Sequence, residues 1–111
     1  NQTQKDSRDN SAKSKVSAIA AALEKYYDTN GEYPTCAQIA APTASQAVAA
    51  GVLQGIDPNA LARQNATTGT NSINCTAATT TTFAYSTTGT SYTLSYIEEA
   101  TGNTATSTRQ R

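Results

Sequence analysis

A stripe of apolar side chains near the N-terminus is the feature that most constrains how this chain can fold. The stripe repeats at the three- and four-residue spacing of one α-helix face, and its members are Val16, Ile19, Ala20, Leu23, Tyr26 and Tyr27. Asn30 and Gly31 form a stop signal, and Pro34 makes resumption of the helix unfavourable. We therefore predict one helix from about Asp6, or earlier, to about Thr29, followed by a terminating turn at Asn30, Gly31 and Pro34.

The part of the chain before this stripe, residues 1–15, carries no strongly apolar side chain. A helix that is polar on every side has nothing to bury and is expected to fray in isolation. We interpret this segment as the stub of a longer helix, and a disordered leader is the alternative. Because the chain does not begin with Met and shows no signal-peptide pattern, we expect it to be a processed or trimmed product.

Alternating residues in the second half of the chain predict strands. The predicted segments are 80–86, 92–98 and an exposed edge strand at 104–108, with a short strand at 73–77. The first two flank a Gly-containing turn at 87–90, which is typical of a β-hairpin. One face of this hairpin is apolar through Phe83, Tyr85 and Leu94, so we expect it and the helix stripe to cover each other.

Together these patterns predict an α+β fold in a single domain, residues 1–111. A long N-terminal α-helix packs on an antiparallel β-sheet meander of three to four strands. The helix takes residues 1–30, a connecting loop with short helices takes 31–79, and the sheet takes 80–108. The residues predicted to make the helix–sheet contact are Val16, Ile19, Leu23, Tyr27, Phe83, Tyr85 and Leu94.

The chain has two cysteines, Cys36 and Cys75, which lie 39 residues apart and match no zinc or redox motif. An even count in a polar, Thr-rich chain predicts one disulfide formed in an oxidising compartment, and two unrelated buried thiols are the alternative. In the chain-entropy model, closing a loop of this length stabilises the fold by roughly 4 kcal/mol.

Composition argues against several classes of function. Eight basic and eight acidic side chains cancel, so the basic excess of a nucleic-acid binder is missing and no nucleic-acid partner is expected. There is no His, the commonest general base and metal ligand, and we predict no enzymatic activity, no metal site and no cofactor. No apolar run reaches the roughly 18–20 residues of a membrane span. Twenty Thr and twenty Ala predict a surface typical of secreted and cell-surface proteins.

The charged and aromatic clusters have ordinary explanations. Glu98 and Glu99 are neighbours in a strand and point to opposite faces, so we interpret them as a solvated strand end instead of a catalytic pair. The six Tyr are interpreted as packing residues with hydroxyls at the rim, the alternative being a carbohydrate platform. A solvated helix face is expected to carry the N-terminal basic residues Lys5, Arg8, Lys13 and Lys15.

The segment from Ser7 to Pro34 resembles the second half of the N-terminal helix of type IV pilins and type II secretion pseudopilins. In that family a polar stretch leads into I-x-x-A-L-x-x-Y-Y-x-x-N-G-x-Y-P, which residues 19–34 match. The hairpin at 83–94 is similar to the family's F/Y-x-Y…G-x-x-Y-x-L pair. The resemblance covers about residues 6–34 and 82–98, and it implies a long helix, a variable connecting loop and an antiparallel sheet.

The resemblance implies a structural subunit of an extracellular type IV pilus that assembles through its N-terminal helix and exposes this domain for adhesion or motility. The implied partners are other pilin subunits in a helical filament and, before assembly, the membrane of a bacterial cell. The family contacts both through about 20 apolar residues that precede this part of the helix and are not among these 111. A host-cell or surface ligand is an open alternative.

Two other functions stay open. A type II secretion pseudopilin is the alternative within the family, whose major pseudopilins hold calcium with acidic and carbonyl ligands near the C-terminus. This chain has no Asp or Glu after Glu99, which favours the pilus subunit. An unrelated cell-surface adhesive or binding module is the third hypothesis. We expect loop 36–75 and the turns near 87–90 and 100–103 to carry any contacts with a ligand or partner.

Overall fold

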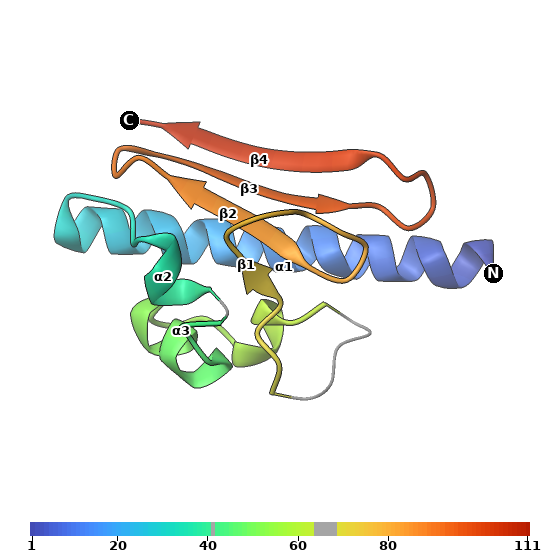
Figure 1. The fold of residues 1–111 in the computed structure, drawn as a ribbon, viewed down its shortest axis with the longest axis horizontal. Coiled ribbons are helices and arrows are strands. Elements are labelled where there is room, and N and C mark those ends of the chain that lie inside the picture. Colours follow the sequence, from blue (N-terminus) through green and yellow to red (C-terminus); the bar gives the residue numbers. More distant parts are fainter. Residues whose placement is uncertain (41, 64–68) are drawn as a thin grey trace.

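The computed structural model of this chain describes residues 1–40, 42–63 and 69–111. A long helix forms one layer and a four-stranded sheet the other, with short helices grouped next to strand β1 (Figure 1). In chain order the elements are α1 (Gln2–Asn30), α2 (Cys36–Ile39), α3 (Gln46–Val52), the 3₁₀ helix η1 (Pro58–Leu61), β1 (Ile73–Asn74), β2 (Phe83–Thr87), β3 (Ser91–Ile97) and β4 (Thr104–Gln110).

Helix α1 includes the polar segment that precedes the apolar stripe. Its first turn is capped by Asn1, whose side-chain Oδ1 accepts a hydrogen bond from the Gln4 backbone N–H at 2.9 Å. The helix ends at Asn30, and Gly31 follows with φ of 77° and donates its N–H to the Tyr27 carbonyl. A positive φ is accessible to glycine without the Cβ clash that other residues suffer, which explains this residue at the helix end.

The sheet is mixed, so the predicted antiparallel meander is wrong for one of its strands. The order is β1-β2-β3-β4, in which β2, β3 and β4 are antiparallel neighbours while β1 runs parallel to β2. A parallel pair requires a connection that returns the chain to the same end of the sheet, and residues 75–82 provide it. The return begins at Asn74, whose Oδ1 accepts backbone N–H bonds from Thr76 and Ala77 and so turns the chain directly after β1.

Strand β4 lies at the free edge of the sheet and is longer than predicted. Its register with β3 is unbroken from Thr104 opposite Ile97 to Gln110 opposite Ser91. Strand β1 at the other edge covers only Ile73–Asn74, because the chain turns away before Cys75. The two edges of the sheet therefore differ greatly in length.

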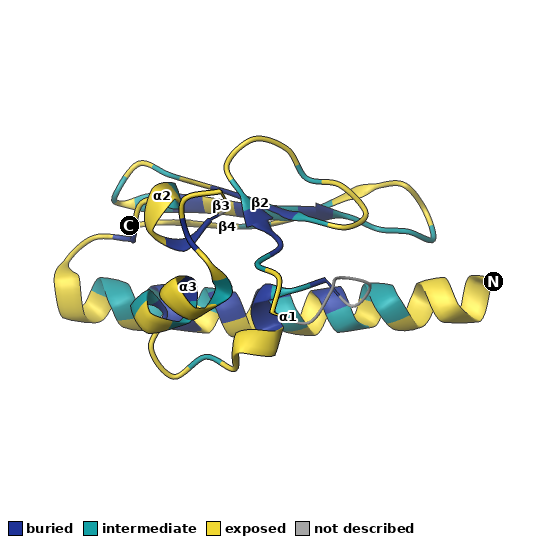
Figure 2. Ribbon diagram, turned by 60° about the horizontal axis from the view of Figure 1, so that its bottom comes forward, coloured by how far each residue is buried: buried dark blue, intermediate teal, exposed yellow. Residues whose placement is uncertain are grey.

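The core lies between α1 and the sheet and continues beneath the short helices, as the buried residues in Figure 2 show. Tyr27, one of the predicted contact residues, is half-buried against this core, and the others are buried: Val16, Ile19, Leu23, Phe83, Tyr85 and Leu94. The short helices add Ile39, Leu53 and Leu61. Burying each aliphatic or aromatic side chain of this size contributes about 1.5–3 kcal/mol.

Candidate functional site along helix α1

The start of α1 is joined to the turn between β3 and β4 by contacts that we call the N-terminal anchor. The Asp9 carboxylate accepts the backbone N–H groups of Glu99 at 2.8 Å and Ala100 at 3.0 Å. Arg8 donates from Nε and Nη2 to the two carboxylate oxygens of Glu99 at 2.6 and 3.1 Å, a bidentate pair. The interpretation of Glu99 as a solvated strand end and of Arg8 as part of a solvated helix face is therefore wrong.

Acid is expected to weaken the N-terminal anchor. The hydrogen bond from Arg8 lowers the pKa of the Glu99 carboxyl below its ordinary value. Because the folded-state pKa is the lower one, the stabilisation is present above the unfolded-state pKa of about 4.3 and is lost as the pH falls through the folded-state value. Both side chains reach solvent, so we expect a small effect.

We expect Glu99→Gln to lose less stability than the parent chain when the pH is lowered from about 6 to about 3, because the variant has no carboxylate to protonate at this position. Urea unfolding at several pH values measures the difference. Glu98→Gln is the matched control, since the adjacent Glu98 carboxylate makes no ion pair within the described ranges 1–40, 42–63 and 69–111. Identical pH profiles for the two variants would contradict this role of Glu99.

The middle of α1 is joined to the segment after η1 by the central anchor, which consists of Lys15, Ala62 and Arg63. Lys15 donates from Nζ to the Ala62 carbonyl at 2.6 Å. Burial lowers the pKa of the Lys15 ammonium, and the nearby Arg63 guanidinium lowers it further. Lys15 is therefore also more than a solvated member of the helix face.

Arg63 is the buried cation of this anchor, with only 3% of its surface exposed. Its guanidinium donates to three backbone carbonyls, those of Thr79 at 3.1 Å, Thr82 at 3.4 Å and Ile97 at 3.5 Å. It also lies over two aromatic rings, with Cζ 5.5 Å from the Phe83 centroid and 5.2 Å from the Tyr96 centroid. One side chain thus joins the loop before β2 to the end of β3.

Burial lowers the pKa of Arg63, and the nearest acidic groups, Glu99 and Asp9, oppose that shift. The guanidinium stays protonated at neutral pH, because the ordinary pKa of an arginine lies far above neutrality. The central and N-terminal anchors are therefore electrostatically linked. Nothing in the sequence pattern singled out Arg63, since its partners are backbone carbonyls and rings far along the chain.

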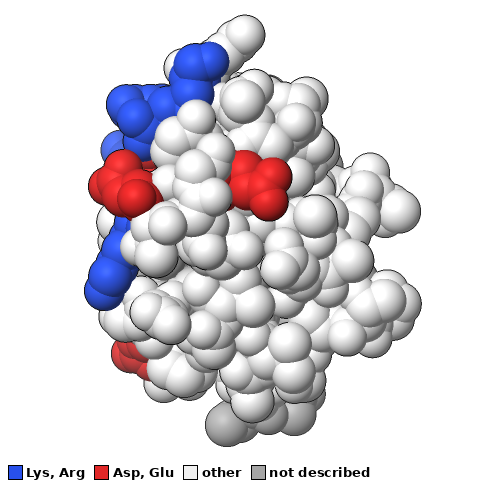
Figure 3. Space-filling model, turned by 90° about the vertical axis from the view of Figure 1, so that its left-hand side faces the viewer, with Lys and Arg blue, Asp and Glu red and all other residues white. Residues whose placement is uncertain are grey.

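The last turns of α1 are joined to the end of β4 by the C-terminal anchor. Arg111 donates to the Glu24 carboxylate and to Tyr33 Oη, and its Cζ lies 4.6 Å from the Tyr27 ring centroid. Tyr33 donates from Oη to Glu24 at 2.8 Å and from its backbone N–H to the Gly89 carbonyl. Figure 3 shows this end of the molecule, where most of the visible basic and acidic side chains lie along one side, an acidic group lies near the middle, and the rest of the face is uncharged.

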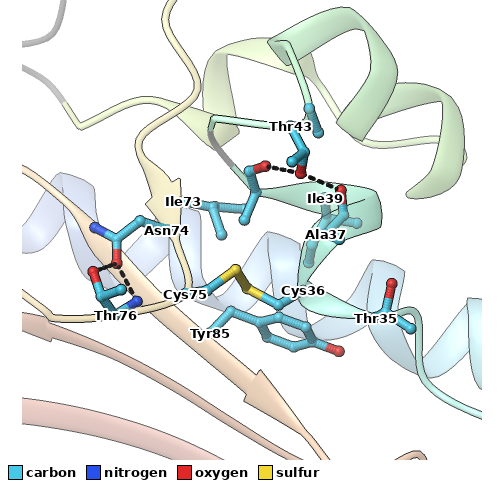
Figure 4. Close-up of a disulfide and its surroundings, with 12 residues drawn as sticks. Thr35, Cys36, Ala37, Ile39, Thr43, Ile73, Asn74, Cys75, Thr76 and Tyr85 are labelled. Carbon is cyan, nitrogen blue, oxygen red and sulfur yellow. Dashed lines mark hydrogen bonds between the residues drawn. A yellow bond between two sulfur atoms is a disulfide. The ribbon is translucent and has the colours of Figure 1, made fainter.

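Cys36 and Cys75 form a disulfide between the start of α2 and the residue after β1 (Figure 4). Their Cα atoms are 5.9 Å apart. The segment leading into Cys36 is also held by Tyr85, which donates from its buried hydroxyl to the Pro34 carbonyl at 2.7 Å. The disulfide therefore ties the connecting segment to the short edge of the sheet.

The face of α1 that points away from the sheet carries small and polar side chains. Its exposed residues include Asn10, Ser14, Ala18, Ala21 and Lys25. A shallow groove runs along one flank between Ala18 and Ile56, and another along the opposite flank between Ala20 and Ala105. Within the described part of the chain, Val48 is the one large apolar side chain with high exposure.

The two turns that we expected to contact a ligand both make structural contacts, one with the segment after α1 and the other with α1 itself. The carbonyl of Gly89, in the 87–90 turn, accepts the Tyr33 N–H, and the N–H of Ala100, in the 100–103 turn, donates to Asp9. In loop 36–75, residues 41 and 64–68 lie outside the described residues. Both turns thus contribute to holding the fold together. That they also contact a ligand stays a prediction.

The chemistry along α1 is that of packing and attachment. Among residues 1–40, 42–63 and 69–111, no group of three or more acidic or Cys side chains is placed to hold a metal ion. None of the described helices combines the length and the apolar character of a membrane span. Comparison of this chain with protein-family models, with curated proteins and with solved structures found no match. A functional conclusion therefore depends on how α1 is held and on what it leaves exposed.

Proposed function

We propose that this chain is the outer domain of a type IV pilus subunit and that α1 is the domain-side end of a longer assembly helix. The observation that carries the proposal is the way α1 is held. At 1.5 Å per residue, its 29 residues span about 43 Å. The longest dimension of the molecule is 43 Å, so the helix runs the full length of the domain, and its N-terminal turn reaches the end of the molecule (Figure 1).

The three anchors support a role for α1 in transmitting tension to the rest of the domain. A subunit in a filament must pass tension from its assembly helix to its outer domain. Here the helix is attached near its start by Arg8 and Asp9, in its middle by Lys15, and near its end by Glu24. Apolar packing between these points adds resistance to sliding, because displacement of α1 would expose Val16, Ile19 and Leu23.

The proposed mechanism is assembly by apolar burial. In the complete subunit, an apolar segment before Asn1 sits in the membrane and then packs among equivalent helices in the filament core. At about 25 cal/mol per Å² of buried apolar area, repeated contacts give a strong polymer without covalent links. A heterologous contact that does not close generates a helical fibre. The domain described here forms the extracellular coat, and its surface is what a host cell or another ligand meets.

The exposed face of α1 provides the test. We expect Ala21→Glu in the complete gene to reduce the yield of filaments sheared from cells at least about tenfold, because assembly would bury an unpaired carboxylate. Ala21 is exposed in the isolated domain, so the unfolding free energy of that domain should change by no more than about 0.5 kcal/mol.

Thr80→Glu, at an exposed loop position away from α1, is the matched control and should leave the filament yield unchanged. Normal filaments from Ala21→Glu would argue against assembly through α1. Equal loss of filaments from both variants would point to an indirect effect of the added charge.

A further inference from the structure

The two edges of the sheet are protected very differently. Strand β1 offers two residues, and the chain then turns at Asn74 toward the disulfide. Strand β4 offers seven residues with no proline and no break in its register with β3. A long, regular edge presents a row of unpaired N–H and C=O groups that another strand can use. Nothing described beside the outer side of β4 covers this edge (Figure 1).

The backbone groups that face outward from β4 can be assigned from hydrogen bonds at its two ends. Glu98 donates its N–H to the Asn103 carbonyl, and Arg111 donates its N–H to the Thr90 carbonyl. Hydrogen-bonded and non-hydrogen-bonded pairs alternate in an antiparallel ladder, so odd-numbered residues from 103 to 111 bond to β3. The free N–H and C=O groups therefore belong to the even-numbered residues Thr104, Thr106, Thr108 and Gln110.

We propose that β4 pairs with β4 of a second copy of this chain, antiparallel and around a two-fold axis at Ser107. In this register Thr104 pairs with Gln110 and Thr106 pairs with Thr108, so each outward-facing group meets one on the other copy. The same patch contacts itself, which is the geometry of a closed, isologous dimer. The result is a continuous eight-stranded sheet formed by strand addition.

Charges on the edge are complementary in this register. Arg109 lies on the helix side of β4, where it is opposite Tyr92 in β3. It would be opposite Ala105 of the second copy, next to Glu98, which shares a groove with Ala105. Arg109 and Glu98 of the second copy are separated by two strand spacings across the sheet and by two residues along it. Their Cα atoms are therefore about 12 Å apart, a distance that the two extended side chains bridge.

Both partners of this cross-copy pair reach the surface of their own copy. Within the described residues, the Glu98 carboxylate accepts a hydrogen bond only from the Thr101 hydroxyl. The nearest carboxylate to Arg109 is that of Glu24, at 3.9 Å, and half of the Arg109 side chain is exposed. Lys13 lines the same groove and carries the same charge as Arg109, so it repels the incoming guanidinium. The net attraction therefore depends on direct contact between Arg109 and the Glu98 carboxylate. The symmetry makes this contact twice.

The added strand would also cover apolar surface. The groove beneath the β4 edge is lined by Val16, Ala20, Tyr96 and Ala105, together with polar neighbours. The helix-facing side chains of the second β4 would lie along it. Because one strand pair buries less than a standard interface of about 1,600 Å², the dimer should be weak and dependent on concentration. This inference goes beyond the proposed function and does not require it. In pili, the pairing of β4 with β4 would join domains of adjacent filaments.

Sedimentation equilibrium of the 111-residue chain, from about 10 μM to about 1 mM, tests the proposal. We expect a monomer–dimer equilibrium with no larger species. Thr106→Pro removes an outward N–H without breaking the bonds to β3, and it should weaken dimerisation at least about tenfold. Thr106→Val keeps that N–H and should dimerise like the parent. Thermal unfolding by circular dichroism confirms that both variants are folded.

A charge exchange tests the register. Arg109→Glu should weaken the dimer, and Arg109→Glu combined with Glu98→Arg should restore it, because the pair is re-formed with reversed charges. Four results would overturn the proposal: a monomer at every concentration, a dimer that Thr106→Pro leaves unchanged, a dimer that the charge exchange does not restore, or open-ended polymers. None of these results depends on whether the complete protein forms pili.

Discussion

Loss of the Cys36–Cys75 disulfide is expected to lower the free energy of unfolding by about 4 kcal/mol. The bond closes a loop of 39 residues, and in the chain-entropy model a loop of this length restricts the unfolded chain by that amount. The total stability of a domain this size is about 5–15 kcal/mol, so the loss is a large share of it. In this model the physical cause lies in the unfolded state, because the bond removes conformations that the unfolded chain would otherwise adopt.

Urea unfolding of the double variant Cys36→Ser/Cys75→Ser measures this loss directly. Cys75 is exposed, so a small reductant reaches the bond, and reduction of the parent chain should give the same result. Reductant added to the double variant is the control and should change nothing. A difference below about 1 kcal/mol would mean that other contacts already restrict the segment between α2 and β1 in the unfolded chain.

Arg63→Met should lower the free energy of unfolding by about 3 kcal/mol. The variant keeps most of the side-chain volume, but it leaves the Thr82 and Ile97 carbonyls without the guanidinium and removes both ring contacts. A buried acceptor left unsatisfied costs about 1–3 kcal/mol, and a desolvated cation–π contact is worth about 2 kcal/mol. Part of this loss is offset, because the variant no longer has the desolvation cost of a buried charge.

Arg63→Lys distinguishes the effect of the positive charge at this position from the effect of the planar guanidinium group. Lys keeps the charge but lacks the planar fork that reaches three carbonyls, so we expect it also to be destabilised, by less than Arg63→Met. Lys5→Met, which removes an exposed cation from α1, is the control and should be neutral to within about 0.5 kcal/mol. If Arg63→Met proved as harmless as Lys5→Met, the buried contacts of Arg63 would not contribute to stability.

Local patterns were sufficient to predict the two layers of the fold. The stripe from Val16 to Tyr27 repeats at the helical period, and the alternation around Phe83 and Leu94 repeats at the strand period. Both signals come from neighbours in the sequence. They predicted that a long helix and a sheet would pack face to face, as in the α+β structure.

The parts that sequence reasoning missed depend on contacts between distant residues. Asp9 and the Glu99 backbone are 90 residues apart, and neither side of that contact has a local signature. Strand β1 has two residues, too few for alternation to be visible, and its parallel pairing follows from how residues 75–82 return to β2. Arg63 has no signature in the sequence, because the backbone carbonyls that it binds are not revealed by any residue type.

A cryo-electron microscopy reconstruction of filaments sheared from cells that make this protein tests most directly whether α1 continues into a filament core. We expect a helical core of packed apolar helices, each continuous with α1 of a domain on the outside, and the exposed face around Ala18 and Ala21 turned toward neighbouring subunits. Filaments that lack this domain, or in which α1 ends at Asn1 without entering the core, would show that this chain is not a pilus subunit assembled through α1.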